Sequence, residues 1–558
     1  MSNLGFNSGY IEELYRQYLD NPESVSESWK EFFQDYRPDH GFVAVTGARS
    51  VYTESKALVA PIDEKREALE AAPSWADEEP IRGAGAKIVE NMQASLAVPT
   101  ATSVRTVPVK LMAENRMLIN EHQRLVGGNK VSFTHIIAWA IVKGLKVFPS
   151  LNTTYRYSED GHVHVVPHAV NLGLAIDIER RGKRTLLVPN IKSADQLNFA
   201  QLLGTYNDLV RRARDNKLEV ADFQQTTATL TNPGMIGTNL SVPRLMDGQG
   251  VIVGVGSIGY PTEYYAFPPE MISKTGISQI MTLTSTYDHR VIQGAESGGF
   301  LAHLEELLRG EHGFYEEIFR DLVVPYQPWI PSPDTTPRVG ATGAIAELDF
   351  IQKEASVLQL IRAFRVRGHL QADVNPLGYD WEYHPELDPK SYGLTIWDLD
   401  REFITGGLGG KDLLPLRDIL DILRRTYTRQ IGTEFMHISS PEEKKWISER
   451  IEPNGSEFTI TDDEKRRMLE KLNAAEAFET FLHTKYIGHK RFSLEGSETI
   501  IPVLDRILSD AAEKGVNEVV MGMAHRGRLN LLANIMNKPY ELIFSEFEGN
   551  IDPNTTQG

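Results

Sequence analysis

Residues 285–294 read Ser-Thr-Tyr-Asp-His-Arg-Val-Ile-Gln-Gly and join a strand-like run at 279–287 to a helical pattern at 295–308. A histidine in this position lies on the loop between strand and helix, where reacting groups can reach its imidazole. A thiol with a pKa of roughly 8.5 is mostly protonated at neutral pH, so a reaction that uses the thiolate needs a base. The position of His289 suits a general base in a reaction of that kind. The competing interpretation, which suits an isolated histidine, is a ring that only caps its own loop.

The sequence around this segment predicts a mixed α+β sandwich of about 250 residues, a size that one domain can have. Residues 132–148 are apolar nearly all round, which predicts a buried helix that ends at Pro149. Residues 86–96 follow an amphipathic helical pattern. The strand-like runs are 102–111, 163–166, 172–178, 185–188, 226–231, 250–258 and 279–287.

The flanking regions predict helices and the beginning of a further domain. Aromatic residues between Tyr10 and Tyr36 recur at helical spacing, which predicts a hairpin whose apolar face docks on its own chain or on another subunit. Residues 518–523 predict a short buried strand and 528–536 the helix after it, the opening of a doubly wound α/β domain. Because an open parallel strand is a poor place for a domain to end, we expect a fragment of a longer protein. Further helices are predicted at 350–368, 397–403, 413–428 and 474–481.

The predicted fold class is multidomain, α/β and α+β. Its expected parts are an N-terminal helical segment at 1–38, a linker at 39–81, the α+β sandwich at 82–324, a second linker at 325–345 and the first part of an α/β module at 346–558. The first linker is inferred from a fading of hydrophobic periodicity and a composition rich in Ala, Glu, Pro and Ser, and the second from Pro-rich composition.

Composition limits the classes of function. The chain has 58 basic and 76 acidic residues, a net charge of −18, which argues against a nucleic acid or an anionic membrane as the main partner. It has no cysteine, which excludes disulfides, thiolate metal sites and cysteine nucleophiles. The polar N-terminus has no signal-peptide pattern and no stretch approaches the roughly 20 apolar residues that span a bilayer, so we expect a cytoplasmic protein. His162, His164 and His168 are typical of a solvated or packed strand face, so no metal site is predicted.

The segment at 285–294 resembles the histidine loop of CoA-dependent acyltransferase (E2) cores of 2-oxo acid dehydrogenase complexes. Residues 229–234, Thr-Leu-Thr-Asn-Pro-Gly, and 241–245, Ser-Val-Pro-Arg-Leu, extend the resemblance over most of 82–310. It implies CoA and lipoamide as cosubstrates, His289 as the general base that deprotonates the CoA thiol, and a hydrogen bond from the Thr231 hydroxyl to the tetrahedral oxyanion. A buried threonine at a strand end is the competing interpretation.

Two features of the chain depart from the family, one in this region and one in the linker before it. Gln293 stands where the family usually has aspartate, so the charge that an acid would supply is missing. The sequence also lacks the hairpin lysine of a swinging lipoyl domain, so we expect another protein to carry the lipoyl group.

Residues 485–496 and 523–530 resemble the substrate end of the thiamine-dependent 2-oxoglutarate dehydrogenase E1 component. They read Lys-Tyr-Ile-Gly-His-Lys-Arg-Phe-Ser-Leu-Glu-Gly and Met-Ala-His-Arg-Gly-Arg-Leu-Asn. The two carboxylates of 2-oxoglutarate suit a guanidinium fork and histidines. The resemblance implies that Arg491 contacts substrate and cofactor, that His525 contacts substrate, and that thiamine diphosphate and Mg²⁺ are the cofactors. A basic cluster on a solvated loop is the competing interpretation.

One motif of thiamine enzymes is missing. These enzymes hold the Mg²⁺-pyrophosphate with a Gly-Asp-Gly motif that ends at an asparagine, and residues 1–558 contain no Gly-Asp-Gly. We predict that these residues alone do not decarboxylate 2-oxoglutarate, and that the full-length protein does.

Together the two resemblances point to the multifunctional 2-oxoglutarate metabolism enzymes of actinobacterial type, in which a tricarboxylic acid cycle E1 component is fused to a dihydrolipoamide succinyltransferase domain. They imply decarboxylation of 2-oxoglutarate, transfer of succinyl to lipoamide and then to CoA. The implied partners are a lipoyl-bearing E2, dihydrolipoamide dehydrogenase (E3) and further copies of the chain, because related E2 cores are trimeric and related E1 modules dimeric. Two alternatives stay open: an acyltransferase for another acyl group, and a catalytically silent scaffold for an E1 dimer.

Overall fold

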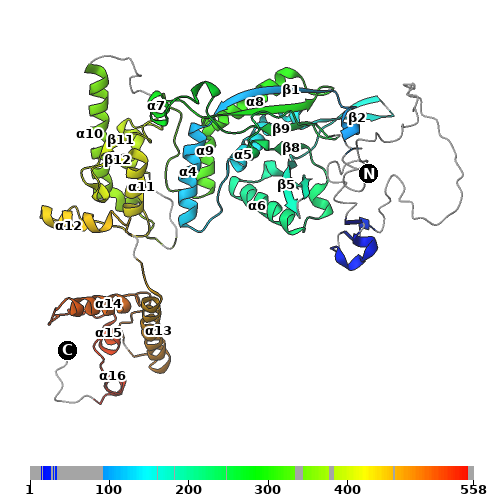
Figure 1. Ribbon diagram of the computed structural model, residues 1–558. Coiled ribbons are helices and arrows are strands. Elements are labelled where there is room, and N and C mark those ends of the chain that lie inside the picture. The colour runs from blue at the N-terminus through cyan, green and yellow to red at the C-terminus, as the bar shows by residue number, and fades with distance from the viewer. Residues whose placement is uncertain are drawn as a thin grey trace, which may run out of the picture. The chain divides into compact units, whose positions relative to one another are not determined.

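The computed structural model describes residues 14–15, 17–26, 29–30, 32–33, 89, 92–159, 161–180, 183–246, 248–333, 344–375, 377, 383–456, 459–489 and 491–550. The chain divides into two compact units, Met1–Gly455 and Ser456–Gly558 (Figure 1). This division is one of packing, and the domain boundaries at 82, 324 and 346 remain predictions. The first linker, at 39–81, lies outside the described residues.

A six-stranded mixed sheet forms the centre of the first unit. Its order is β1-β10-β9-β8-β4-β7, with β9 parallel to β8, β8 parallel to β4 and the other neighbours antiparallel. Five of the six strands lie in predicted runs, and β7 does not. The run at 172–178 is divided between β4 of this sheet and β5 of a separate hairpin, and β1 ends at Pro108 because a helix begins at Lys110. The strands are β1 (Thr100–Pro108), β4 (Leu172–Leu174), β7 (Asn190–Ile191), β8 (Ala228–Thr231), β9 (Val251–Val255) and β10 (Ile280–Asp288).

Helices pack on this sheet and on one another, and the two central ones are α5 and α8. The Ser132 hydroxyl accepts the amide of His135 and the Ser132 amide donates to His135 Nδ1, so the predicted apolar helix begins with a reciprocal cap. A Cβ at Gly144 would lie 2.8 Å from the Phe300 ring, so glycine allows α5 to approach α8 closely. The helices are α4 (Lys110–Leu125), α5 (Phe133–Val147), α6 (Phe199–Asp215), α7 (Pro269–Thr275), α8 (Gly294–Leu308) and α9 (Phe314–Asp321).

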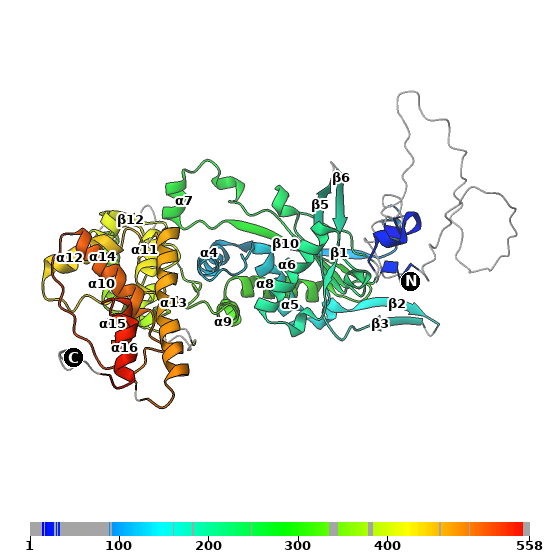
Figure 2. The same ribbon diagram turned by 90° about the horizontal axis from the view of Figure 1, so that it is seen from below.

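Two hairpins extend from this sheet domain, β2 (Thr154–Ser158) with β3 (Gly161–Val165) and β5 (Ile176–Arg180) with β6 (Lys183–Leu187) (Figure 2). The predicted N-terminal helical hairpin is partly described. Residues 14–15, 17–20, 29–30 and 32–33 are helical. Trp29 is 2% exposed and donates from Nε1 to the Leu218 carbonyl at 2.9 Å. The aromatic face therefore docks on its own chain.

Residues 344–455 complete the first unit with α10 (Ala344–Arg367), α11 (Leu416–Tyr427), α12 (Pro441–Ile451) and the strand pair β11 (Glu402–Ile404) and β12 (Leu413–Pro415). The helix predicted at 397–403 is wrong. The buried Asp398 carboxylate accepts from the Thr395 amide and from Lys353, and such side-chain bonds hold a turn instead of a helix. Arg417 of α11 forms a bidentate pair with Glu114 of α4, which links this region to the sheet domain.

The second unit is helical, with α13 (Asp462–Lys485), α14 (Ile500–Glu513), α15 (Arg528–Asn534) and α16 (Tyr540–Phe547). The strand predicted at 518–523 is wrong: residues 516–524 are irregular, and Val520 is 99% exposed. A strand needs a neighbour for its backbone hydrogen bonds, and the described residues of this unit contain none. Across the described part of the chain, no helix has the length and apolarity to cross a membrane.

Candidate active site

His289 follows the last residue of β10, and the loop backbone fixes its ring. Its amide donates to the Pro99 carbonyl at 2.9 Å, and its Nδ1 lies 3.0 Å from the Ile292 carbonyl oxygen. Because a carbonyl oxygen can only accept, Nδ1 carries the ring hydrogen and Nε2 of the neutral ring keeps its lone pair. The residue is exposed. The loop therefore presents an accessible imidazole in the tautomer that a general base needs.

The residues on either side of His289 hold this loop in place, a role that was not predicted from the sequence. Asp288 is 2% exposed, and its carboxylate accepts from Arg290 Nη2 at 2.6 Å, Arg290 Nε at 2.9 Å and the Arg290 amide at 3.0 Å. The Arg290 guanidinium carbon lies 4.0 Å from the ring centroid of Tyr155. A buried charge needs such a partner. The Asp-x-Arg spacing around the histidine was the available sequence signal.

Gln293, the departure from the family pattern, lies where α8 begins. The backbone N–H of Gln293 donates to Glu296 Oε2 at 2.8 Å, so the Glu296 carboxylate satisfies a backbone donor at the start of the helix. The buried hydroxyl of Ser297 donates to that of Ser285 at 2.9 Å and ties α8 to β10. The helix start is therefore held by Glu296 and Ser297, both close to the His289 loop.

Thr231 lies at the opposite end of the sheet from His289. Thr231 pairs with Gly254, and Gly254 with Thr284 of β10. At the other end, the Asp288 amide donates to the Gly250 carbonyl, and the Gly250 amide to Thr227. Four residues separate Thr227 from Thr231, about 13 Å at roughly 3.3 Å per residue, and two strand spacings of about 4.8 Å add a lateral offset. One chain therefore does not bring these two residues together.

The second unit holds Arg491 and His525. Arg491 donates to Glu479 at 3.0 Å and Glu495 at 3.1 Å, and its Nη2 lies 2.9 Å from His483 Nδ1. The second oxygen of Glu479 accepts from Asn530 at 3.1 Å. The guanidinium predicted to receive a substrate carboxylate is thus bonded to carboxylates of its own chain.

His525 has a neighbour from the other predicted motif. Its ring centroid lies 5.4 Å from that of Phe492, and the Gly527 amide donates to the Phe492 carbonyl at 2.9 Å. The structure therefore brings the segments at 485–496 and 523–530 together.

The histidines on β3 do not form a candidate metal site. His162 Nδ1 lies 2.7 Å from the Tyr155 hydroxyl, and His164 is exposed on the same strand. Neither belongs to a group of three potential metal ligands in the described part of the chain.

Comparisons with known proteins agree with this organisation. Residues 74–313 match the family model of the 2-oxoacid dehydrogenases acyltransferase catalytic domain, and residues 4–40 match that of the 2-oxoglutarate dehydrogenase N-terminus. The chain is 45% identical to the multifunctional 2-oxoglutarate metabolism enzyme of Mycolicibacterium vanbaalenii. The match covers the whole of this chain and 47% of that enzyme. It is 44% identical to the enzyme of that name from Mycobacterium sp. strain KMS, and this match covers the whole chain and 48% of that enzyme. It thus spans about half the length of these curated relatives.

Among solved structures, a probable dihydrolipoamide acetyltransferase from Listeria monocytogenes is similar to this chain at 24% identity and a TM-score of 0.36. The match covers 44% of this chain and 95% of that chain.

Proposed function

Because this chain is a homologue of the multifunctional 2-oxoglutarate metabolism enzymes and contains a 2-oxoacid dehydrogenase acyltransferase catalytic domain, we propose that it transfers a succinyl group from dihydrolipoamide to CoA. The observation that carries this proposal is the hydrogen bond from His289 Nδ1 to the Ile292 carbonyl. It leaves Nε2 free to accept a proton on an exposed loop. The segments at 485–496 and 523–530 favour succinyl over other acyl groups.

In the proposed reaction, His289 Nε2 removes the proton of the CoA thiol and the thiolate sulfur attacks the thioester carbonyl carbon of succinyl-dihydrolipoamide. A carbon–sulfur bond forms, and the oxyanion of the tetrahedral intermediate accepts a hydrogen bond from the Thr231 hydroxyl. The bond to the lipoyl sulfur then breaks, and the imidazolium returns its proton to that sulfur. The products are succinyl-CoA and dihydrolipoamide.

This reaction requires two copies of the chain. His289 and Thr231 lie at opposite ends of one sheet, so they can act on one substrate only where the His289 end of one copy meets the Thr231 end of another. We therefore propose a homo-oligomer with the catalytic sites between its subunits.

Co-assembly of two inactive variants tests this proposal. Mixed oligomers of His289→Ala and Thr231→Ala chains should recover succinyltransferase activity, because some sites receive His289 from one chain and Thr231 from the other. Each variant assembled alone should stay inactive. A mixture no more active than the separate variants would contradict a shared site, and activity with acetyl or branched-chain thioesters at equal efficiency would contradict succinyl specificity.

For the oxo-acid step, we propose that Arg491 and His525 contact 2-oxoglutarate in the longer protein, with a lipoyl-bearing E2 and dihydrolipoamide dehydrogenase as partners. The residues described here do not fit thiamine diphosphate and Mg²⁺. Residues 1–558 lack the Gly-Asp-Gly motif with which thiamine enzymes hold the Mg²⁺-pyrophosphate. Release of CO₂ from 2-oxoglutarate by residues 1–558 with both cofactors added would contradict this assignment.

The second candidate function is a silent scaffold for an E1 dimer, which the neutral Gln293 favours. Calorimetry with CoA separates the two functions, because a scaffold need not keep a thiol pocket. Binding of CoA that weakens in Thr231→Ala and His289→Ala would support the transferase.

A further inference from the structure

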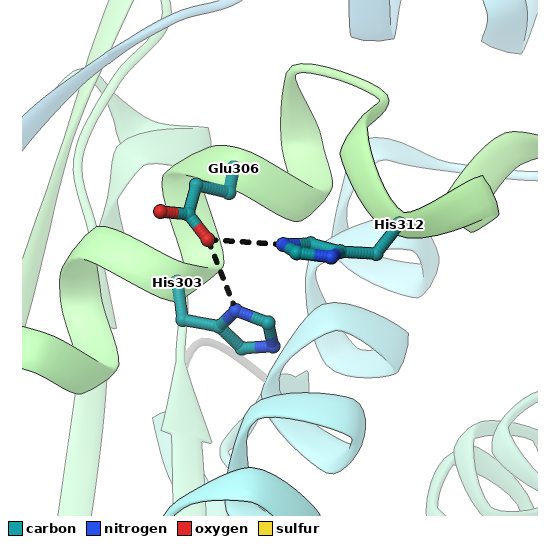
Figure 3. A group of neighbouring side chains, drawn as sticks. All are labelled: His303, Glu306 and His312. Carbon is teal, nitrogen blue, oxygen red and sulfur yellow. Dashed lines mark hydrogen bonds and ion pairs between the residues drawn. The ribbon is translucent and has the colours of Figure 1, made fainter.

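Two histidines and a glutamate meet at the end of α8 that is remote from the His289 loop (Figure 3). His303 Nδ1 lies 3.2 Å from Glu306 Oε2, and His312 Nε2 lies 3.0 Å from the same oxygen. The three potential ligand atoms all lie within 4.8 Å of one another. In the described part of the chain this is the group of three that has such geometry. Spacing along the sequence drew attention to His162, His164 and His168 and gave no sign of this group.

Backbone geometry fixes this arrangement. His303 and Glu306 are three residues apart on α8 and therefore share one face of the helix. After α8 ends, Gly310 adopts φ 85° and His312 itself adopts φ 59°, which turns the chain back over the helix. Positive φ is uncommon for a residue other than glycine, and such conformations concentrate at functional sites. The turn places the His312 ring centroid 5.1 Å from that of His303.

The surroundings suit a cation with one open coordination position. The His303 side chain is 14% exposed and lies against Phe148, with ring centroids 6.1 Å apart, whereas Glu306 is 45% and His312 53% exposed. One side of the group is thus backed by an aromatic ring and the other faces solvent. Glu306 also lies in the last turn of α8, where the helix dipole is negative and attracts cations.

We propose that His303, Glu306 and His312 bind a zinc-class divalent cation. Two imidazole nitrogens and one carboxylate form the ligand set of open zinc sites, with water in the fourth position. Imidazole donors select zinc and its transition-metal neighbours over Mg²⁺ and Ca²⁺, which prefer all-oxygen sites. Bound metal would replace the two hydrogen bonds to Glu306, and each neutral ring would carry its hydrogen on the nitrogen that faces away.

The consequence of binding is structural. A metal ion would join the last turns of α8 to the turn before α9 and so fasten the helix whose first turn adjoins His289. An ion that binds the folded chain raises its unfolding temperature according to its concentration and affinity.

The test is titration of tag-free 1–558 protein with Zn²⁺, followed by calorimetry and by thermal unfolding. One Zn²⁺ per chain should bind and raise the unfolding temperature, and Mg²⁺ should do neither. His312→Ala and Glu306→Gln should each weaken Zn²⁺ binding by at least about tenfold, since loss of even an outer-shell partner costs that much. Both side chains are partly exposed, so these variants should fold.

The matched control is His164→Ala, which removes an exposed imidazole from β3, outside the group. It should bind Zn²⁺ like the unchanged chain. Substitution of Co²⁺ adds a spectroscopic readout, with visible absorption that is lost in His303→Ala. Equal Zn²⁺ affinity in His312→Ala and His164→Ala, or no binding by the unchanged chain, would overturn the proposal.

Discussion

The acyltransferase domain and the second unit differ in how far each one positions its own candidate site. Around His289, a buried Asp288, a backbone carbonyl and a six-stranded sheet fix the loop, the tautomer and the exposure of the ring. In the second unit, the guanidinium of Arg491 is bonded to Glu479, Glu495 and His483. The segment that leads to His525 is irregular and exposes Val520.

This difference shows that a functional side chain is held in place only where the secondary structure that carries it is itself held by neighbouring elements. β10 has neighbours on both sides, so the loop at its end is held on a rigid base. Among the described residues of their unit, residues 516–524 have no strand beside them, so no sheet in that described part supports His525. The two candidate sites therefore differ in the framework beneath them, even though the residue types of both suit their chemistry.

The largest expected effect is on acyl transfer. His289→Ala should lower kcat for succinyl transfer from dihydrolipoamide to CoA by about 10²–10⁴-fold, the usual contribution of a general base. Arg491→Ala should leave this rate within about twofold, because no step of the proposed transfer uses it. Steady-state assays with free succinyl-dihydrolipoamide measure both. A full rate in His289→Ala, or an equal loss in Arg491→Ala, would remove the contrast between the two sites.

The second-largest expected effect is on stability, where a substitution in the first unit should cost more free energy of unfolding than one in the second. Phe300→Ala, at a residue with 0% exposure on α8, should lower the free energy of unfolding of the first unit by about 3–5 kcal/mol. Val520→Ala, at a side chain that is 99% exposed, should change that of the second unit by less than about 0.5 kcal/mol.

Denaturant titration can follow the units separately, because all 7 tryptophans precede Ser456. Tryptophan fluorescence reports the first unit, and hydrogen exchange of the α13 and α15 amides reports the second. A loss of more than about 1 kcal/mol in Val520→Ala would mean that this side chain is buried, as the predicted strand required.

Local patterns predicted the sheet domain well because its strands and helices find their hydrogen-bond and packing partners within the same unit. The alternation at 279–287 became β10 and the apolar run at 132–148 became α5, since both found partners in the same unit. The strand at 518–523 failed for want of a neighbour, and the helix at 397–403 failed because the Asp398 carboxylate bonds to Thr395 and Lys353. No local pattern could show that Thr231 and His289 lie at opposite ends of the sheet, because that follows from the antiparallel direction of β10 relative to β8 and β9.

The smallest expected effect is a difference in pH dependence. Burial lowers the pKa of His135, the capping residue of α5, from 6.5 to about 4. The folded first unit thus binds fewer protons than its unfolded form between these values, so its stability should fall as the pH falls from 6.5 to about 4. In the second unit, hydrogen bonds from the Thr461 backbone and hydroxyl and from Arg506 lower the pKa of Glu464 from 4.5 to about 2. Its contribution should persist to pH 4.5 and disappear only below that value.

Calorimetric unfolding from pH 7 to pH 4.5 should therefore lower the transition of the first unit while that of the second stays nearly constant. His135→Gln keeps a hydrogen-bond acceptor for the Ser132 amide but cannot take up a proton, so it should reduce the pH dependence of the first transition. His164→Gln, at an exposed imidazole, should not. If the two transitions shifted together, His135 and Glu464 would not give the two units separate pH dependences. If both variants behaved alike, buried His135 would not account for the acid sensitivity of the sheet domain.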